Sequence, residues 1–255
     1  MKTKFRFLTA FLACICFPPA FSAQFSYEKP GTKQLLLITG RILPGDAATM
    51  LRAIKMEVRR TKNTELVIVL NTPGGDVLEA LRIAEIIEKL ALPVTVEGHC
   101  VSACFFLFVS GAGHVARHNS VGLHRPYLKS PHETEESLNK QKQLILAVRK
   151  YFEAKNIPSN LLDLMMSRPS TDVYWLTTSD LLSIGEYPPE LEELFIAKCG
   201  YDPRRIEKIL EADAALSKIL EAQLERTESC IDQIRSQKFN SNFSAVLNRY
   251  IGENK

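Results

Sequence analysis

The stretch "VTVEGHCVSACFFLFVSGAG", residues 94–113, decides the fold because it passes from a strand pattern into a helix pattern. Its first residues are β-branched and favour a strand, whereas Cys104 to Val109 is an unbroken apolar run typical of a buried helix. Ser102 stands at the junction, where a serine suits a helix N-cap, the commoner role. The same position suits a nucleophile, because the N–H groups at a helix start have no partner within the helix and can bind an oxyanion.

The same strand-to-helix order occurs twice upstream of this stretch. Strands are predicted in "KQLLLITGRI" (33–42) and "ELVIVLNTPGGD" (65–76), and helices over 44–60 and 76–92. The run Leu66 to Leu70 is wholly apolar, as expected of a strand covered on both faces. The second helix carries only a narrow polar stripe: Glu79, Arg82, Glu85 and Lys89. Repeats of this length predict right-handed βαβ crossovers and a largely parallel sheet.

Downstream, short strands are expected in 114–127, a long helix over 132–156 and a short helix from 159 to Pro169. From about Pro188 the pattern becomes helical throughout. A long helix over 201–237 is predicted, with Asp202 as N-cap and Pro203 at its first position. Its apolar residues recur at helical spacing, so we expect it to pack on the domain or on another subunit.

The first 23 residues have the order of a secretory signal peptide: basic residues, an apolar stretch, then prolines and small residues. We therefore predict export to the periplasm, with a lipid anchor at Cys14 or a retained N-terminus as the alternative. Removing Lys2, Lys4 and Arg6 leaves 29 of the 32 basic residues against 29 acidic ones. A chain of such balanced charge gives no reason to expect a nucleic-acid partner.

Four cysteines remain after the leader. A Cys199–Cys230 bridge is open, because spacing cannot establish pairing. Cys100, Cys104, His114 and His118 superficially resemble a zinc pattern, but the intervening residues are too few and mostly apolar. We expect Cys104 to be an ordinary buried thiol, and we predict no metal and no cofactor.

Three segments with the residue types of an acyl-transfer site fall into one region of the expected sheet. They are "NTPGGD" (71–76), "GHCVSAC" (98–104) and "NSVGLHRP" (119–126). The first two follow parallel strands, whose carboxyl ends form the ligand-binding edge of an open α/β sheet. Glycine amides, a serine at a helix start and a nearby histidine are the parts that acyl transfer needs.

This series resembles the Clp protease proteolytic subunit and its relatives in the Clp protease/crotonase superfamily, especially the exported branch. "WLTTSDLLSIGE", residues 175–186, resembles a later segment of the same family. The resemblance covers 33–187 and implies a βαβ spiral with a largely parallel sheet, followed by a helical C-terminal extension over 188–255. It implies a serine hydrolase that acts as a peptidase on peptide or protein substrates.

Residue by residue, the resemblance places Ser102 on the family's nucleophile and His124 on its general base. The amides of Gly75 and Ala103 fall on the oxyanion hole, and Gly74 is expected to bind substrate. Asp172 is the candidate third triad member after a shift of one residue, since the direct alignment gives Val173; Asp180 and Glu186 are the alternatives.

Two rival functions stay open from the sequence. One is a non-catalytic periplasmic peptide-binding or regulatory relative of the fold. The other is an acyl-coenzyme A enzyme of crotonase type, which export and the Ser–His pair disfavour. Formation of a homo-oligomer and attachment to a membrane through an uncleaved or lipidated N-terminus also stay open.

Overall fold

The computed structural model describes residues 22–29, 34–61, 66–128, 134–205, 208 and 214–252. Nearly all of the predicted signal peptide (residues 1–21) therefore lies outside the described residues. Residues 206–207 and 209–213, in the first part of the predicted C-terminal helix, also lie outside them. The predicted N-cap Asp202 is described, and its side chain accepts from the Arg204 N–H at 2.9 Å.

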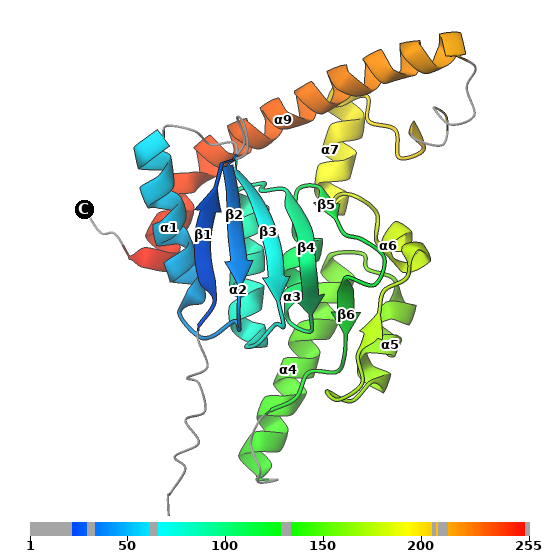
Figure 1. The fold of residues 1–255 in the computed structure, drawn as a ribbon. Coiled ribbons are helices and arrows are strands. Elements are labelled where there is room, and N and C mark those ends of the chain that lie inside the picture. Colours follow the sequence, from blue (N-terminus) through cyan, green and yellow to red (C-terminus); the bar gives the residue numbers. More distant parts are fainter. Residues whose placement is uncertain are drawn as a thin grey trace, which may run out of the picture.

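A single mixed sheet forms the centre of the molecule (Figure 1). Its order is β1-β2-β3-β4-β6-β7, with β5 pairing on β4. The pairs among β2, β3, β4, β5 and β6 are parallel, and the two edge strands β1 and β7 are antiparallel. The bounds are β1 Gln24–Glu28, β2 Gln34–Thr39, β3 Leu66–Thr72, β4 Val94–Val101, β5 His114–Val115, β6 Val121–Leu123 and β7 Tyr174–Trp175. The prediction of a largely parallel α/β sheet is confirmed.

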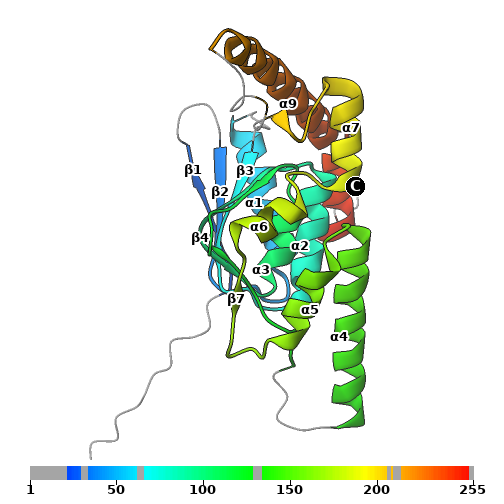
Figure 2. The same cartoon turned by 90° about the vertical axis from the view of Figure 1, so that its right-hand side faces the viewer.

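The helices α1, α2 and α3 lie on one side of this sheet, with α4 outside them (Figure 2). Their apolar faces and the inner face of the sheet form the main core. The bounds are α1 Asp46–Thr61, α2 Val77–Lys89, α3 Cys104–Val109, α4 Glu135–Ala154, α5 Ser159–Ser167, α6 Thr178–Ile184, α7 Pro189–Cys199 and α9 Ala214–Ile251. All six residues of α3 are buried, as the apolar run predicted.

Two features of the sheet differ from the sequence prediction. Val67 in β3 is partly exposed, so the second face of this strand is not fully covered within one chain. The sheet also includes β1, ahead of the predicted domain start at residue 33, with Gln24 opposite Thr39. This short edge strand alternates between exposed and half-buried residues, so its sequence has only a weak apolar pattern. The strongly apolar leader just before it made this pattern hard to recognise.

The C-terminal helices pack back onto the domain. Phe239, Val246 and Leu247 of α9 belong to the main core cluster, and the Asn242 side chain donates to the Lys89 carbonyl at 2.7 Å. The other end of α9 projects away from the sheet (Figure 1). The helix continues to Ile251, well beyond the predicted end at 237. Among the described helices, none has an apolar stretch that is long enough to cross a bilayer.

A disulfide joins Cys199 at the end of α7 to Cys230 in α9, which answers the pairing that the sequence left open. Their Cα atoms are 5.6 Å apart, a distance typical of disulfides. The bridge closes a separation of 31 residues and therefore constrains the C-terminal helices as a pair.

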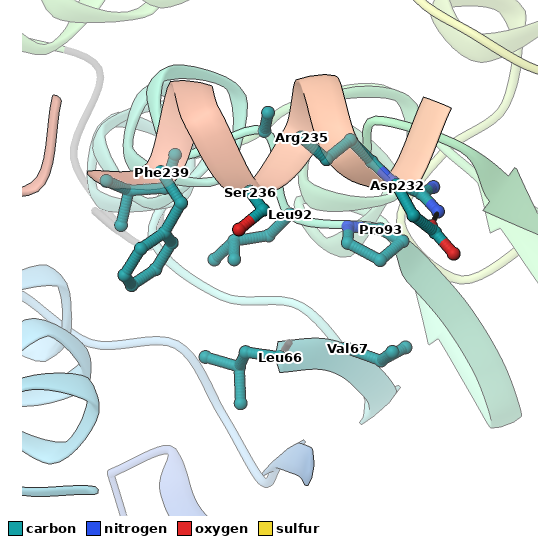
Figure 3. A pocket seen from close by; sticks show the side chains of 10 residues that line it. Leu66, Val67, Leu92, Pro93, Asp232, Arg235, Ser236 and Phe239 are labelled. Atoms are coloured by element: carbon teal, nitrogen blue, oxygen red, sulfur yellow. Dashed lines mark hydrogen bonds and ion pairs between the residues drawn. The ribbon is translucent and has the colours of Figure 1, made fainter. Parts of the chain in front are cut away.

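A small crevice of about 60 Å³ lies under α9 (Figure 3). It is lined by Leu66, Leu92 and Pro93 from the sheet side and by Phe239 and other residues of α9. Leu66 and Pro93 mark the amino-terminal ends of β3 and β4. The crevice is therefore a seam between helix and sheet, at the edge opposite the strand ends that carry the predicted site.

The structure also predicts how stability depends on pH. His114 in β5 is 6% exposed and packs edge-on against Phe108 at 4.8 Å between ring centroids. Burial lowers the pKa of His114 below its ordinary value of about 6.5. The unfolded chain thus takes up a proton here at higher pH than the folded chain does. The contribution of His114 to the free energy of unfolding is full above about pH 6.5 and is lost as pH falls.

We expect His114→Leu to flatten the pH dependence of the free energy of unfolding between pH 7.5 and 5.5, as measured by urea titration. The wild-type slope from this one residue can reach at most about 1.4 kcal/mol per pH unit below 6.5. His118→Leu is the matched control for the loss of one histidine, because His118 is exposed. Equal slopes in all three proteins would contradict the account.

Candidate active site

Ser102 occupies a sharp turn between β4 and α3. Its φ is 58°, a left-handed conformation that residues other than glycine rarely adopt. The Ser102 N–H donates to the Gly122 carbonyl at 2.8 Å, and the Ser102 carbonyl accepts from the Phe105 N–H at 3.0 Å. The N-cap of α3 is Ala103, with no side-chain cap hydrogen bond, so the interpretation of Ser102 as a capping side chain is wrong. Among the described residues, the Ser102 hydroxyl has no hydrogen-bond partner.

The loop after β3 lies directly against this turn. Gly74 has a φ of 82°, and a Cβ built on it would collide with the Val101 carbonyl oxygen. The same Cβ would lie 2.8 Å from the Ala103 nitrogen and 3.1 Å from the Ser102 Cβ. No side chain fits between the loop and the serine turn. The "PGG" segment therefore brings backbone, rather than side chains, to Ser102.

Hydrogen bonds to Ile42 fix the position of this loop. The Ile42 N–H donates to the Gly74 carbonyl and the Asp76 N–H donates to the Ile42 carbonyl, both at 2.9 Å. The Gly74 N–H donates to the Thr72 hydroxyl at 3.1 Å. Within the described part of the chain, the amides of Gly75 and Ala103 have no acceptor. These are the two amides that the family resemblance places on an oxyanion hole.

Two buried carboxylates hold the segment that carries Ile42. Asp46 accepts from the Leu43 N–H at 2.7 Å, and Glu79 accepts from the Gly45 and Ala47 N–H groups at 2.9 and 2.8 Å. Both acids are 2% exposed. The sequence placed Glu79 on a solvent-facing stripe, and that prediction is wrong because its carboxylate binds the neighbouring segment. The position of Glu79 in the first turn of α2 was the available signal in the sequence, because acids there often bind backbone N–H groups.

His124 directly follows β6 and is 9% exposed. The Ser102 N–H donates to the carbonyl of Gly122 in β6. His124 comes two residues after Gly122 in the chain, so β6 brings it to the serine turn. The His124 Nδ1 lies 3.0 Å from the Arg125 carbonyl oxygen. This contact favours the tautomer with the proton on Nδ1, which leaves Nε2 as the basic nitrogen. Neither ring nitrogen is hydrogen-bonded to the Ser102 hydroxyl, as far as the described residues go.

The three candidate acids are engaged elsewhere. Asp172 pairs with Arg168 at 2.6 Å and its side chain is about half exposed. Glu186 pairs with Arg205 at 2.6 Å. Asp180 accepts from the Thr177 N–H, its hydroxyl and the Tyr174 hydroxyl, as part of the capping box of α6. Among the described residues, the partner on Nδ1 of His124 is the Arg125 carbonyl, and Asp172 as third triad member stays a prediction.

The hydrogen bonds of Asp180 also fix its charge. Burial acts to raise its pKa, but the hydrogen bonds from Thr177 and Tyr174 hold the pKa below its ordinary value. The carboxylate is thus ionised at neutral pH and committed to its helix cap.

A cleft of about 750 Å³ begins at the Gly75 loop and extends to α4. Its lining is mostly apolar and includes Leu43, Val77, Leu78 and Leu144. Tyr127 also lines it, with its ring 6.0 Å from that of His124. The cleft thus connects the Gly75 loop to the surroundings of His124. Its volume and mostly apolar lining suit a partly apolar ligand.

Cys100 and Cys104 form a disulfide that brackets Ser102. The expectation that Cys104 is a free buried thiol is therefore wrong, because its sulfur is bonded to that of Cys100. The histidines of the same pattern lie apart, His114 buried and His118 exposed. The described residues include no group of three or more His, Cys, Asp and Glu side chains placed to hold a metal ion.

A comparison with protein-family models matches residues 28–159, just over half of the chain, to the Clp protease family. The chain belongs to this family. The match contains the Gly74–Gly75 loop, Ser102 and His124, whereas Asp172 lies beyond its end. A search of curated proteins found no match.

The close approach of the glycine loop predicts the effect of an added methyl group. Gly74→Ala should lower the free energy of unfolding by at least about 2 kcal/mol, because it combines backbone strain with a collision. Gly200→Ala is the matched control, since Gly200 has a φ of 66° and open space around its Cβ position. It should cost about 1 kcal/mol. Urea unfolding measures both, and equal losses would contradict the packing of the loop against the serine turn.

Proposed function

We propose that this Clp protease family member is a serine peptidase with Ser102 as nucleophile and His124 as general base. One observation carries the proposal. The Gly74 backbone lies against a strained serine turn, and the adjacent amides of Gly75 and Ala103 have no acceptor among the described residues. Unpaired amides in this position can donate to the oxyanion that forms when the neighbouring hydroxyl attacks a carbonyl.

The proposed reaction runs in two steps. The Ser102 Oγ attacks the peptide carbonyl while His124 Nε2 takes the hydroxyl proton, and the amides of Gly75 and Ala103 donate to the oxyanion. His124 then gives the proton to the leaving amine as the C–N bond breaks. A water, deprotonated by His124, hydrolyses the acyl-serine and restores the hydroxyl. Each oxyanion donor contributes roughly 100- to 1,000-fold to such a rate.

The orientation of the base has two sources in this proposal. The Arg125 carbonyl accepts from His124 Nδ1 and fixes the tautomer. A carbonyl adds no charge, so the imidazolium is less stabilised than it is beside a carboxylate. Asp172 supplies that charge if its side chain exchanges Arg168 for His124, and this is why we keep it as the third member.

The substrate we propose is a peptide or an unfolded protein segment. Family membership suggests protein substrates and oligomerisation. The apolar cleft beside Gly75 accommodates side chains of an extended peptide, and Gly74 offers it backbone contact. We propose no cofactor, because the serine, the base and the amides suffice for this hydrolysis.

We further propose that the protein is exported, with a leader over 1–23, a catalytic domain over 33–187 and a helical extension over 188–255. Two disulfides support this, since such bridges form and persist in oxidising compartments. The periplasmic location rests on the leader pattern in the sequence.

A non-catalytic peptide-binding role is the second candidate. It is favoured by two observations on the described residues: His124 makes no hydrogen bond to Ser102, and no carboxylate is hydrogen-bonded to its ring. Catalytic hydrogen bonds are often long in ligand-free enzymes and tighten on binding, so we rank this role second.

Labelling with a fluorophosphonate probe separates the two functions. We expect wild type to be phosphonylated and Ser102→Ala to be unlabelled. His124→Ala should react about 100- to 10,000-fold more slowly, because it lacks the base. Ser120→Ala is the control, since the Ser120 hydroxyl donates to the Arg117 carbonyl and takes no part in the site.

Folding of every variant is checked by circular dichroism. Folded wild type that stays unlabelled from pH 5 to 10 would exclude an activated serine and favour the peptide-binding role. Labelling that survives in Ser102→Ala would place the nucleophile elsewhere.

A further inference from the structure

We propose that the Cys100–Cys104 disulfide is a positioning device for the nucleophile turn, and that Cys100 and Cys104 act in catalysis through Ser102 and Ala103. The proposal rests on the proposed function of Ser102. It assigns to these cysteines a role that goes beyond holding the fold together.

The bridge encloses the two groups on which the proposed chemistry depends. Cys100 and Cys104 have Cα atoms 5.1 Å apart, and between them lie the Ser102 hydroxyl and the Ala103 amide. One end of the bridge is fixed in the sheet, where Cys100 pairs with Thr72 on one side and Val121 on the other. The other end is the first residue of α3. The bridge thus ties the sheet to the helix across the turn.

This turn needs such a restraint. Ser102 holds a φ of 58°, a conformation that is unfavourable for a residue with a Cβ and persists only where the surroundings enforce it. Its backbone hydrogen bonds run to Gly122 and Phe105 and fix the ends of the turn separately. The disulfide joins these ends covalently. The Ala103 nitrogen is thereby kept beside Gly74, where the oxyanion amides must lie.

The two disulfides among the described residues are suited to different tasks. Cys100–Cys104 spans a sequence separation of 4, and Cys199–Cys230 spans 31. A short loop removes less freedom from the unfolded chain than a long one, so the first bridge is the weaker global restraint. Both sulfurs of the first bridge are buried in the main core, next to the site. The second bridge is remote from Ser102 and provides a control.

The test compares Cys100→Ala/Cys104→Ala with Cys199→Ala/Cys230→Ala. We expect the first variant to lose about 10- to 100-fold in phosphonylation rate and in kcat, with KM little changed, because the cleft beside Gly75 is intact. The second variant should lose thermal stability but keep both rates within about twofold of wild type. If the Cys100–Cys104 bridge acted only through global stability, both variants would lose rate in proportion to their loss of stability.

Hydrogen–deuterium exchange supplies a readout that does not depend on activity. We expect faster exchange across residues 101–106 in the first variant, with α1, α2 and α9 unchanged. The single variants Cys100→Ala and Cys104→Ala each break the bridge while they remove one sulfur only. If the double variant does not fold, the exchange measurement is made on these single variants instead.

The outcomes separate this proposal from the proposed function. Unlabelled wild type with faster exchange at 101–106 in the variant would overturn the serine peptidase and the catalytic role of the bridge, and would keep only its role in ordering the turn. Labelled wild type with unchanged rate and exchange in the variant would overturn the positioning role alone. Equal rate losses in both double variants would also overturn it.

Discussion

The contact between the Gly74 backbone and the Ser102 turn is the constraint on which the rest of this structure depends. It requires glycine at 74, because any Cβ there would collide with the Val101 carbonyl and crowd the Ala103 nitrogen. It also requires the left-handed conformation of Ser102, which is costly for a serine. Together they leave the amides of Gly75 and Ala103 without acceptors among the described residues, and for this reason we propose an oxyanion site there.

The surrounding fold serves to keep these two backbone segments together. On the loop side, Ile42 pairs with Gly74 and Asp76, and the buried Asp46 and Glu79 carboxylates secure the segment that carries Ile42. On the serine side, β6 accepts the Ser102 N–H and places His124 just beyond. Each support consists of hydrogen bonds in a buried region, where losing one partner costs more than the bond itself contributes.

The sequence predicted the parts that depend on periodicity and local chemistry. The strand–helix alternation, the buried helix after Ser102 and the Gly–Gly turn were all expressed in residue patterns. Long-range contacts were not. Glu79 looked solvent-facing because its partners are amides of a distant loop, and spacing alone could not pair Cys100 with Cys104. Asp172 was chosen by alignment to the family, but in the structure its carboxylate pairs with Arg168, four residues earlier in the chain.

The central claim is that Ser102, Gly75 and Ala103 form one reaction centre. A crystal structure of the phosphonylated protein tests it most directly. The account predicts a covalent bond from Ser102 Oγ to phosphorus, with the phosphoryl oxygen within about 3 Å of both the Gly75 and Ala103 nitrogens. An adduct whose phosphoryl oxygen points away from these amides, or one formed on a different residue, would contradict it.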